Sequence, residues 1–171
     1  MASASVLDDP IYQTASQQTL ARIVSFLEEK QIEFRKVHHE ATFTSEESAK
    51  ARGEDISTGG KAILMKLDDK FVLFVISASR KLDSKKIKQK YNPKKIRFAN
   101  VDELKNLTGG LVPGCVPPFG RPILSFDLNI DESITRNEKI AFNAGSLTDS
   151  VIMNVNDYLK VSEGNVFAFS E

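Results

Sequence analysis

A lysine at the start of an apolar segment is the first candidate for chemistry in this chain. Lys61 follows two glycines and precedes the apolar residues 62–65. A charge among apolar neighbours is costly to bury unless a ligand or partner compensates it. Lys61 therefore predicts a binding or catalytic site at the beginning of a buried strand.

A loop of small and rigid residues at 114–120, with the sequence Gly-Cys-Val-Pro-Pro-Phe-Gly, is the second candidate. Proline fixes φ and removes an amide donor, whereas glycine adopts backbone conformations closed to other residues. The remaining amides of such a loop can be directed at a carbonyl or an oxyanion. The alternative interpretation is a stiff connection between strands. Residues 143–146, Asn-Ala-Gly-Ser, supply another small-residue turn with an amide and a hydroxyl.

The single cysteine and the two histidines are the other nucleophile and metal-ligand candidates. Cys115 with a histidine and a carboxylate would make a thiol hydrolase, but it has no helix start or basic neighbour in sequence to lower its pKa. The alternative is a small residue in a tight loop. His38 and His39 are adjacent at a strand end and face opposite ways, and no CxxC or HxxxH spacing adds ligands. We predict no metal site and no cofactor.

The composition is that of one globular domain. The 171 residues are 41% hydrophobic and 27% charged, which is enough apolar chain for a core. No apolar run reaches the roughly 18–20 residues that cross a bilayer, and the first residues have neither the basic region nor the apolar core of a secretory signal. One cysteine cannot form an internal disulfide, which fits a reducing compartment. These features predict a cytoplasmic protein with no membrane partner.

The formal net charge of zero hides a strongly basic segment at 80–97. This segment contains nine basic residues and one acidic residue, so its charge is +8. One interpretation is a solvated helix face, and the other is a surface for a polyanion such as RNA. In the second case the lysines expected to contact phosphates are Lys85, Lys86, Lys88, Lys94 and Lys95.

The elements that must position these residues mix helices and strands without strict alternation. We expect a flexible N-terminal arm at 1–16 and a single domain at 17–171. Spacing and capping patterns, among them a capping box at 44–47, predict helices at 16–30, 45–52, 83–91, 102–107 and 157–159. Apolar runs between turn residues predict strands at 31–39, 61–67, 71–77, 96–99, 123–128, 139–143, 150–154 and 166–169, and those at 61–67 and 71–77 form a hairpin. The pattern favours an α+β fold with a mixed, partly closed, barrel-like sheet and surrounding helices.

Three segments, in this order, resemble the YbaK/prolyl-tRNA synthetase editing-domain family. Its members hydrolyse wrongly aminoacylated tRNA, either as free-standing proteins or as domains of prolyl-tRNA synthetase. Residues 60–65 stand where that family has its essential lysine, 114–120 resemble its GxxxP loop, and 142–146 resemble its C-terminal small-residue turn. Residues 37–49 are similar to the strand-to-helix entry of these domains. The resemblance covers roughly residues 17–170.

The resemblance implies a barrel-like mixed sheet ringed by helices and the hydrolysis of aminoacyl-tRNA esters. By position, Lys61 is the main catalytic or substrate-orienting residue, and Gly114 with its loop holds the aminoacyl carbonyl end. The residues implied to bind substrate are His39, Thr44, Cys115, Val116, Pro117, Pro118, Asn143, Gly145 and Ser146.

The implied substrate is a mischarged tRNA, with tRNA(Pro) carrying alanine or cysteine as the first expectation and prolyl-tRNA synthetase as a further partner. Two departures leave the amino acid open, because His39 falls where some members use a tyrosine and Ser150 where some use an aspartate. The alternative function is a non-catalytic tRNA- or synthetase-binding module of the same fold.

Overall fold

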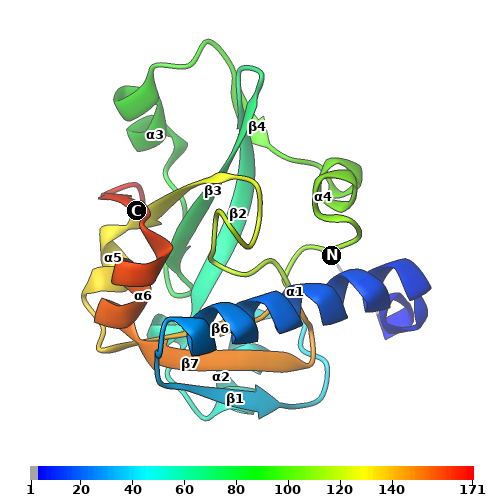
Figure 1. Cartoon of the computed structure of the whole chain (residues 1–171). Coiled ribbons are helices and arrows are strands. Elements are labelled where there is room, and N and C mark those ends of the chain that lie inside the picture. The colour runs from blue at the N-terminus through cyan, green and yellow to red at the C-terminus, as the bar shows by residue number, and fades with distance from the viewer. Residues whose placement is uncertain (1–3) are drawn as a thin grey trace.

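A computed structural model describes residues 4–171, which form two sheets with helices packed around them (Figure 1). The α-helices are α1 (Pro10–Glu29), α2 (Ser45–Arg52), α3 (Ser84–Tyr91), α4 (Val101–Thr108), α5 (Glu132–Thr135) and α6 (Val155–Ser162). The strands are β1 (Phe34–His38), β2 (Gly60–Leu67), β3 (Lys70–Ser77), β4 (Ile96–Phe98), β5 (Asp127–Asp131), β6 (Lys139–Asn143), β7 (Asp149–Asn154) and β8 (Asn165–Phe167). Short 3-10 helices lie at Ala4–Asp8 and Ile56–Thr58.

The small sheet has the order β1-β7-β6 and is antiparallel, while the large sheet has the order β4-β2-β3-β5-β8 and is mixed. In the large sheet, β5 runs parallel to both β3 and β8. A single bridge between Gly59 and Ala141 joins the two sheets, and their strands run in different directions (Figure 1). The α+β class and the mixed sheet are thus confirmed. Each sheet remains open at its edge strands, so the barrel-like closure that we expected is not confirmed.

The central hairpin is buried on both of its faces, because its apolar residues occupy successive positions and side chains alternate along a strand. On one face, Leu64, Leu73 and Val75 join the main core, which also contains residues of α1 and of the small sheet. On the other face, Met65, Phe74 and Ile76 pack with Ile87 of α3 and Phe169. The predicted hairpin at 61–67 and 71–77 is confirmed by its continuous antiparallel register.

The N-terminal segment differs from the flexible arm that we expected at 1–16. Helix α1 begins at Pro10, where the Asp9 side chain accepts a hydrogen bond from the Ile11 amide, a favourable start for a helix. Tyr12 and Ala15 are buried, so the polar residues between them are the solvent face of an amphipathic helix. The arm prediction is wrong for the helical residues, and residues 1–3 lie outside the described part of the chain.

Further differences from the expected elements lie in the second half of the chain. The strand expected at 123–128 is a series of turns up to residue 126, and β5 follows it at Asp127–Asp131. Ile123 and Leu124 donate their amides to Gly120 and are buried in the main core, so their apolar character reflects packing and not strand pairing. Helix α6 is longer than the turn expected at 157–159, and α5 was not expected.

Among residues 4–171, no helix has the length and apolar character needed to cross a membrane.

Candidate functional site

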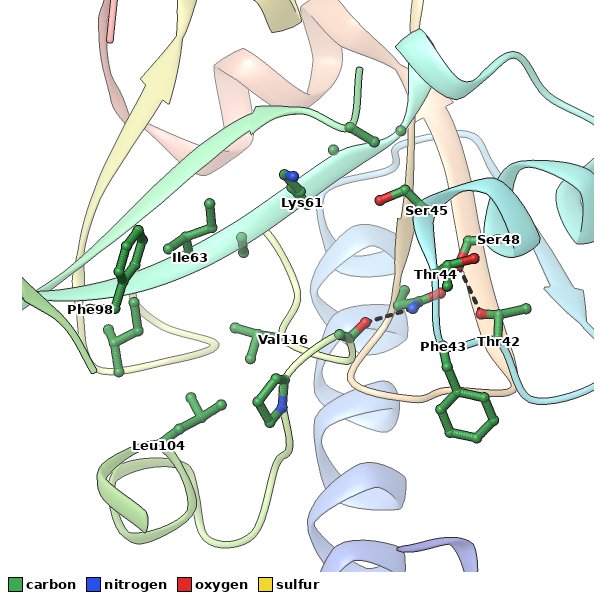
Figure 2. A pocket seen from close by; sticks show the side chains of 18 of the residues that line it. Thr42, Phe43, Thr44, Ser45, Ser48, Lys61, Ile63, Phe98, Leu104 and Val116 are labelled. Carbon is green, nitrogen blue, oxygen red and sulfur yellow. Dashed lines mark hydrogen bonds between the residues drawn. The ribbon is translucent and has the colours of Figure 1, made fainter. Parts of the chain in front are cut away.

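A cavity of about 340 Å³ opens beside the first half of β2. Strand β4 pairs only with residues 65–67 of β2, so the edge of β2 before that point is free to form a wall. The opposite walls come from the loop that leads into α2, from the loop around Gly114 and from the end of β6 (Figure 2). Segments that are distant in sequence thus meet around one space.

Lys61 lies at this free edge and is partly exposed. Side-chain alternation puts Lys61 and Ile63 on one face of the sheet and Ala62 and Leu64 on the other, and all four line the cavity. The cavity therefore wraps around the edge of β2. In Figure 2, Lys61 lies between Ile63 and the Ser45 end of α2. Within residues 4–171 the Lys61 ammonium has no hydrogen bond or ion pair, so it is available to a ligand.

The charges that line the cavity are all positive. Lys61 and Arg52 are the charged residues among its described lining residues, which include no carboxylate. Two cations without an acid in a concave space attract anions. The expected ligand therefore has a negative charge, as a phosphate has.

The loop around Gly114 adds two backbone donors. Gly114 has a φ of 93°, a conformation that favours glycine, and both Gly114 and Val116 line the cavity. The amide between them, that of Cys115, donates to the Val112 carbonyl at 3.2 Å. In the part of the chain that the structure describes, the amides of Gly114 and Val116 donate to no protein acceptor. They are the groups that a developing oxyanion would need.

A buried polar network lies behind this loop. The Asn143 Nδ2 amide donates to the Gly114 carbonyl at 2.6 Å, and Asn143 Oδ1 accepts from Arg52 Nη2 at 3.0 Å. Arg52 Nε donates to Ser150 Oγ at 2.9 Å, which in turn lies 2.9 Å from His39 Nε2. The network joins the end of α2, strands β6 and β7, and the loop.

Arg52 is the functional candidate that the sequence did not reveal. It is only 7% exposed, and burial lowers its pKa to about 10. It is the last residue of α2, before the Gly53 cap, and it follows the buried Ser48 at helical i, i+4 spacing. That spacing is the one sequence signal that Arg52 faces inward.

Five of the predicted site residues line the cavity: Thr44, Lys61, Gly114, Val116 and Asn143. Thr44 also begins α2 with the capping box that its sequence predicted. His39 does not line the cavity, but it contacts the network through Ser150. Of the adjacent histidines, His38 points to solvent and pairs with Asp149 at 2.8 Å.

Five other predicted residues serve the fold and do not line the cavity: Cys115, Pro117, Pro118, Gly145 and Ser146. They come from the loop that follows Gly114 and from the turn that follows β6. Burial raises the pKa of the Cys115 thiol to about 12, and its Sγ donates to the Val112 carbonyl. A buried, protonated thiol is a poor nucleophile, so this environment argues against the thiol-hydrolase alternative.

Packing explains the other four residues. Pro117 is buried, and the Pro118 carbonyl accepts from the Tyr158 hydroxyl at 2.6 Å. A Cβ on Gly145 would lie 2.5 Å from the Thr19 side chain of α1. Ser146 Oγ donates to Asp149 at 2.8 Å within its own turn.

The basic segment occupies the end of the large sheet away from the small sheet (Figure 1). Helix α3 packs through Ile87 on the sheet face that also carries Ile63, and therefore Lys61. Lys85, Lys88, Lys94 and Lys95 are exposed. Lys86 instead donates its ammonium to the Ser170 carbonyl at 2.7 Å.

Known proteins share this sequence and this fold. Residues 39–161 match the family model described as the aminoacyl-tRNA editing domain. The chain is 31% identical over 157 residues to the multifunctional Ser/Thr-tRNA deacylase ProXp-y of Escherichia coli (strain K12), a match that covers 88% of this chain and 92% of that protein. It is 34% identical over 88 residues to a proline--tRNA ligase of Bacillus licheniformis, covering 52% of this chain and 15% of the ligase.

A solved structure described as a candidate trans-editing enzyme for prolyl tRNA synthetase has the same fold, with a TM-score of 0.78 and 22% identity over 90% of this chain and 97% of that one. The family resemblance inferred from the three sequence motifs is therefore confirmed. This chain belongs to the aminoacyl-tRNA editing domain family.

Proposed function

We propose that this member of the family, a hydrolase of aminoacyl-tRNA esters, removes a small hydroxylated amino acid from mischarged tRNA in trans. The observation that carries the proposal is the cavity itself, in which two cations without a carboxylate face a loop with two available amides. An anionic 3′ end that carries an ester fits that combination. The alanine or cysteine that we first expected would use these groups equally well.

Hydroxyl groups distinguish between the candidate amino acids. Thr42, Thr44, Ser45 and Ser48 line one end of the cavity, and Thr42 Oγ1 and Ser48 Oγ lie 2.8 Å apart (Figure 2). A hydroxyl both donates and accepts, so this cluster can pair with a serine or threonine side chain. A site that pairs with a substrate hydroxyl discriminates strongly against analogues that lack one. The name of the E. coli relative, a Ser/Thr-tRNA deacylase, supports the same choice.

The residues allow a simple hydrolytic mechanism. The Lys61 ammonium binds phosphate or ester oxygens of the terminal adenosine, which holds the ester at the cavity. Water adds to the carbonyl carbon, and the amides of Gly114 and Val116 stabilise the oxyanion. The bond to the ribose oxygen then breaks, releasing the amino acid and the free 3′ end. The neighbouring ribose hydroxyl takes the proton of the attacking water and returns one to the leaving oxygen.

The exposed lysines extend this site toward the body of the tRNA. Lys85, Lys88, Lys94 and Lys95 neutralise phosphates, a contribution that weakens with salt. We place the reaction in the cytoplasm, where charged tRNA is available, and we keep prolyl-tRNA synthetase as the proposed source of the mischarged substrate. The similarity to the ligase supports tRNA(Pro) as the first tRNA to test.

The test is a deacylation panel with the wild-type chain and Lys61→Ala. The tRNA(Pro) and tRNA(Ala) substrates are charged with serine, threonine, alanine, cysteine or proline, and ester loss is followed over time. We expect seryl and threonyl esters to be hydrolysed at least about 10-fold faster than alanyl and cysteinyl esters. Faster alanyl or cysteinyl hydrolysis would contradict the choice of amino acid. Binding of tRNA without any turnover would favour the non-catalytic module.

A further inference from the structure

We infer that Arg52 is a positioning residue, which fixes the Asn143 carboxamide and thereby the loop that presents the Gly114 and Val116 amides. The inference rests on the proposed function, because it assigns a task within the same site. It concerns a residue that does not have to touch the reacting ester. Its effect passes through one side chain, Asn143, to one carbonyl, that of Gly114.

The first argument is that Arg52 is a buried cation without a counter-ion. Within residues 4–171 it forms no ion pair with a carboxylate, although it is only 7% exposed. Burying a charge in this way is unfavourable, and the lowered pKa reflects that. An apolar residue would fill the same space at a smaller energetic cost. The guanidinium is therefore better explained by what it holds than by stability.

The second argument is that the fork of Arg52 reaches two strands at once. Nε binds Ser150 Oγ on β7 at 2.9 Å, and Nη2 binds Asn143 Oδ1 on β6 at 3.0 Å. A guanidinium presents these donors in a rigid plane, whereas a lysine ammonium cannot reach both acceptors from fixed directions. The contact with the Ala141 carbonyl is longer, at 3.4 Å.

The third argument follows from counting hydrogens. The Ser150 hydroxyl has a single hydrogen and two neighbours that compete for it. It donates to Asn143 Oδ1 at 3.2 Å, and His39 Nε2 lies 2.9 Å from the same oxygen. Arg52 Nη2 is closer to Asn143 Oδ1, at 3.0 Å.

Arg52 is thus the closer and the charged donor to Asn143 Oδ1. With Oδ1 held by Arg52, Nδ2 is directed at the Gly114 carbonyl, 2.6 Å away. That bond holds the carbonyl of Gly114 against β6 and leaves the amide of the same residue for a ligand. Losing Arg52 frees the carboxamide to rotate and the loop to shift. A displacement of about 1 Å at a reacting centre lowers turnover by as much as 100-fold.

The experiment uses Arg52→Ala, with the tRNA ester that the wild-type chain hydrolyses fastest in the panel. We expect kcat to fall about 10- to 100-fold while KM stays within about threefold. Adding guanidinium ion at millimolar concentration, well below denaturing levels, should restore part of kcat by filling the vacated site. The matched control is Arg22→Ala, because Arg22 is an exposed arginine of α1 that does not line the cavity; that variant should keep its kcat and should not respond to guanidinium.

An NMR measurement reports on the same inference without any enzymatic activity. In ¹⁵N-labelled protein, the carboxamide protons of Asn143 should exchange slowly in the wild-type chain. They should exchange rapidly in Arg52→Ala, and guanidinium should slow them again. Unchanged protection in the variant would overturn the inference even if the chain hydrolysed no ester. Absence of wild-type turnover would instead contradict the proposed function alone.

Asn143→Asp keeps the test decisive if Arg52→Ala fails to fold. The aspartate still accepts from Arg52 and gives it a counter-ion, but it cannot donate to the Gly114 carbonyl. We expect a Tm within about 3 °C of the wild type together with a kcat at least about 10-fold lower. If kcat instead remained at the wild-type level with the Tm preserved, the link from Asn143 to Gly114 would have no role in positioning.

Discussion

The two sides of the cavity are held in opposite ways. On the loop side, Asn143 is bonded both to Arg52 and to the Gly114 carbonyl, and all of these contacts lie among buried residues or at the cavity wall. On the β2 side, Lys61 has no partner within residues 4–171, and the lysines of α3 that share its sheet face are largely exposed. One side is fixed by the fold, and the other is left free.

This difference matches two different requirements. Stabilising an oxyanion needs donors whose positions are set before the reaction, because reorganising them would raise the barrier. Attracting a flexible polyanion needs only positive charge, and long mobile side chains provide it over a range of positions. We therefore expect substitutions on the loop side to lower kcat, and substitutions of the outer lysines to raise KM and change the salt dependence. Lys61, where the two sides meet, should affect both.

Lys61→Ala should have the largest effect. It removes the charge that holds the terminal nucleotide beside the loop, and the loss of one such interaction lowers turnover by roughly 100- to 1,000-fold. Steady-state deacylation kinetics measure the change, and circular dichroism checks that the fold is retained.

The matched control for Lys61 is Lys66→Ala. Lys66 lies on the same strand, where its ammonium sits 5.5 Å from the Phe71 ring, and it does not line the cavity. Wild-type kinetics in Lys61→Ala would show that Lys61 is not part of the site. Equal losses in both variants would point to charge in general and not to the cavity.

Gly114→Ala should have the next largest effect. Its φ of 93° is unfavourable for any residue with a Cβ, by about 1–2 kcal/mol, although the nearest contact of that Cβ would be an acceptable 3.8 Å. The loop relieves this strain by moving, and we expect kcat to fall about 10-fold.

Gly109→Ala separates strain from catalysis. Gly109 ends α4 with a φ of 78°, and a Cβ added to it would have no neighbour within 4 Å, so it carries the same kind of strain away from the cavity. Both variants should lose a few degrees of Tm, but only Gly114→Ala should lose kcat. Equal losses of kcat in the two variants would contradict a catalytic role for the loop around Gly114.

The double substitution of Lys85 and Lys88 by alanine should have a moderate effect. Removing two phosphate contacts raises KM about three- to tenfold at low salt and makes the slope of log affinity against log salt shallower by about two. Lys86→Ala is the matched control on the same helix, because its ammonium already binds the Ser170 carbonyl at 2.7 Å. An unchanged slope in the double variant would favour the interpretation of α3 as a solvated helix face.

The sequence predicted those parts of the site whose signals are local. Lys61 stood out as a charge before an apolar run, and Gly114 as a glycine among prolines. The capping box at Thr44 is a pattern within four residues, and both its hydrogen bonds are present. The hairpin of β2 and β3 followed from two apolar runs and a short turn. Each of these features depends on neighbours in sequence, so the sequence was enough.

The rest of the site depends on contacts between distant segments. The Arg52 side chain faces inward because its hydrogen-bond acceptors lie on β6 and β7, about ninety positions later in the chain. Gly145 looked like a pocket residue, but it is required by the approach of α1 at Thr19. The start of α1 was missed because its burial depends on Tyr12, whose hydroxyl accepts from the Leu147 amide at 2.9 Å. No local pattern encodes these partners.

Cys115→Ser should have the smallest effect, and it tests whether the fixed loop acts through its backbone alone. The Cys115 side chain is fully buried and faces Val112, not the cavity. A serine hydroxyl can make the same contact with the Val112 carbonyl, so kcat should stay within about twofold of the wild type.

Because burial raises the pKa of this thiol to about 12, iodoacetamide should label it slowly in the native protein. That rate should rise throughout pH 7 to pH 10 without levelling off, whereas the rate of an exposed thiol levels off above its pKa of about 8.5. Urea-unfolded chain provides the control, since its thiol is exposed and should be labelled rapidly. Rapid labelling of the folded chain together with loss of deacylation would support a thiol mechanism. Unchanged turnover would show that the loop acts through its backbone amides.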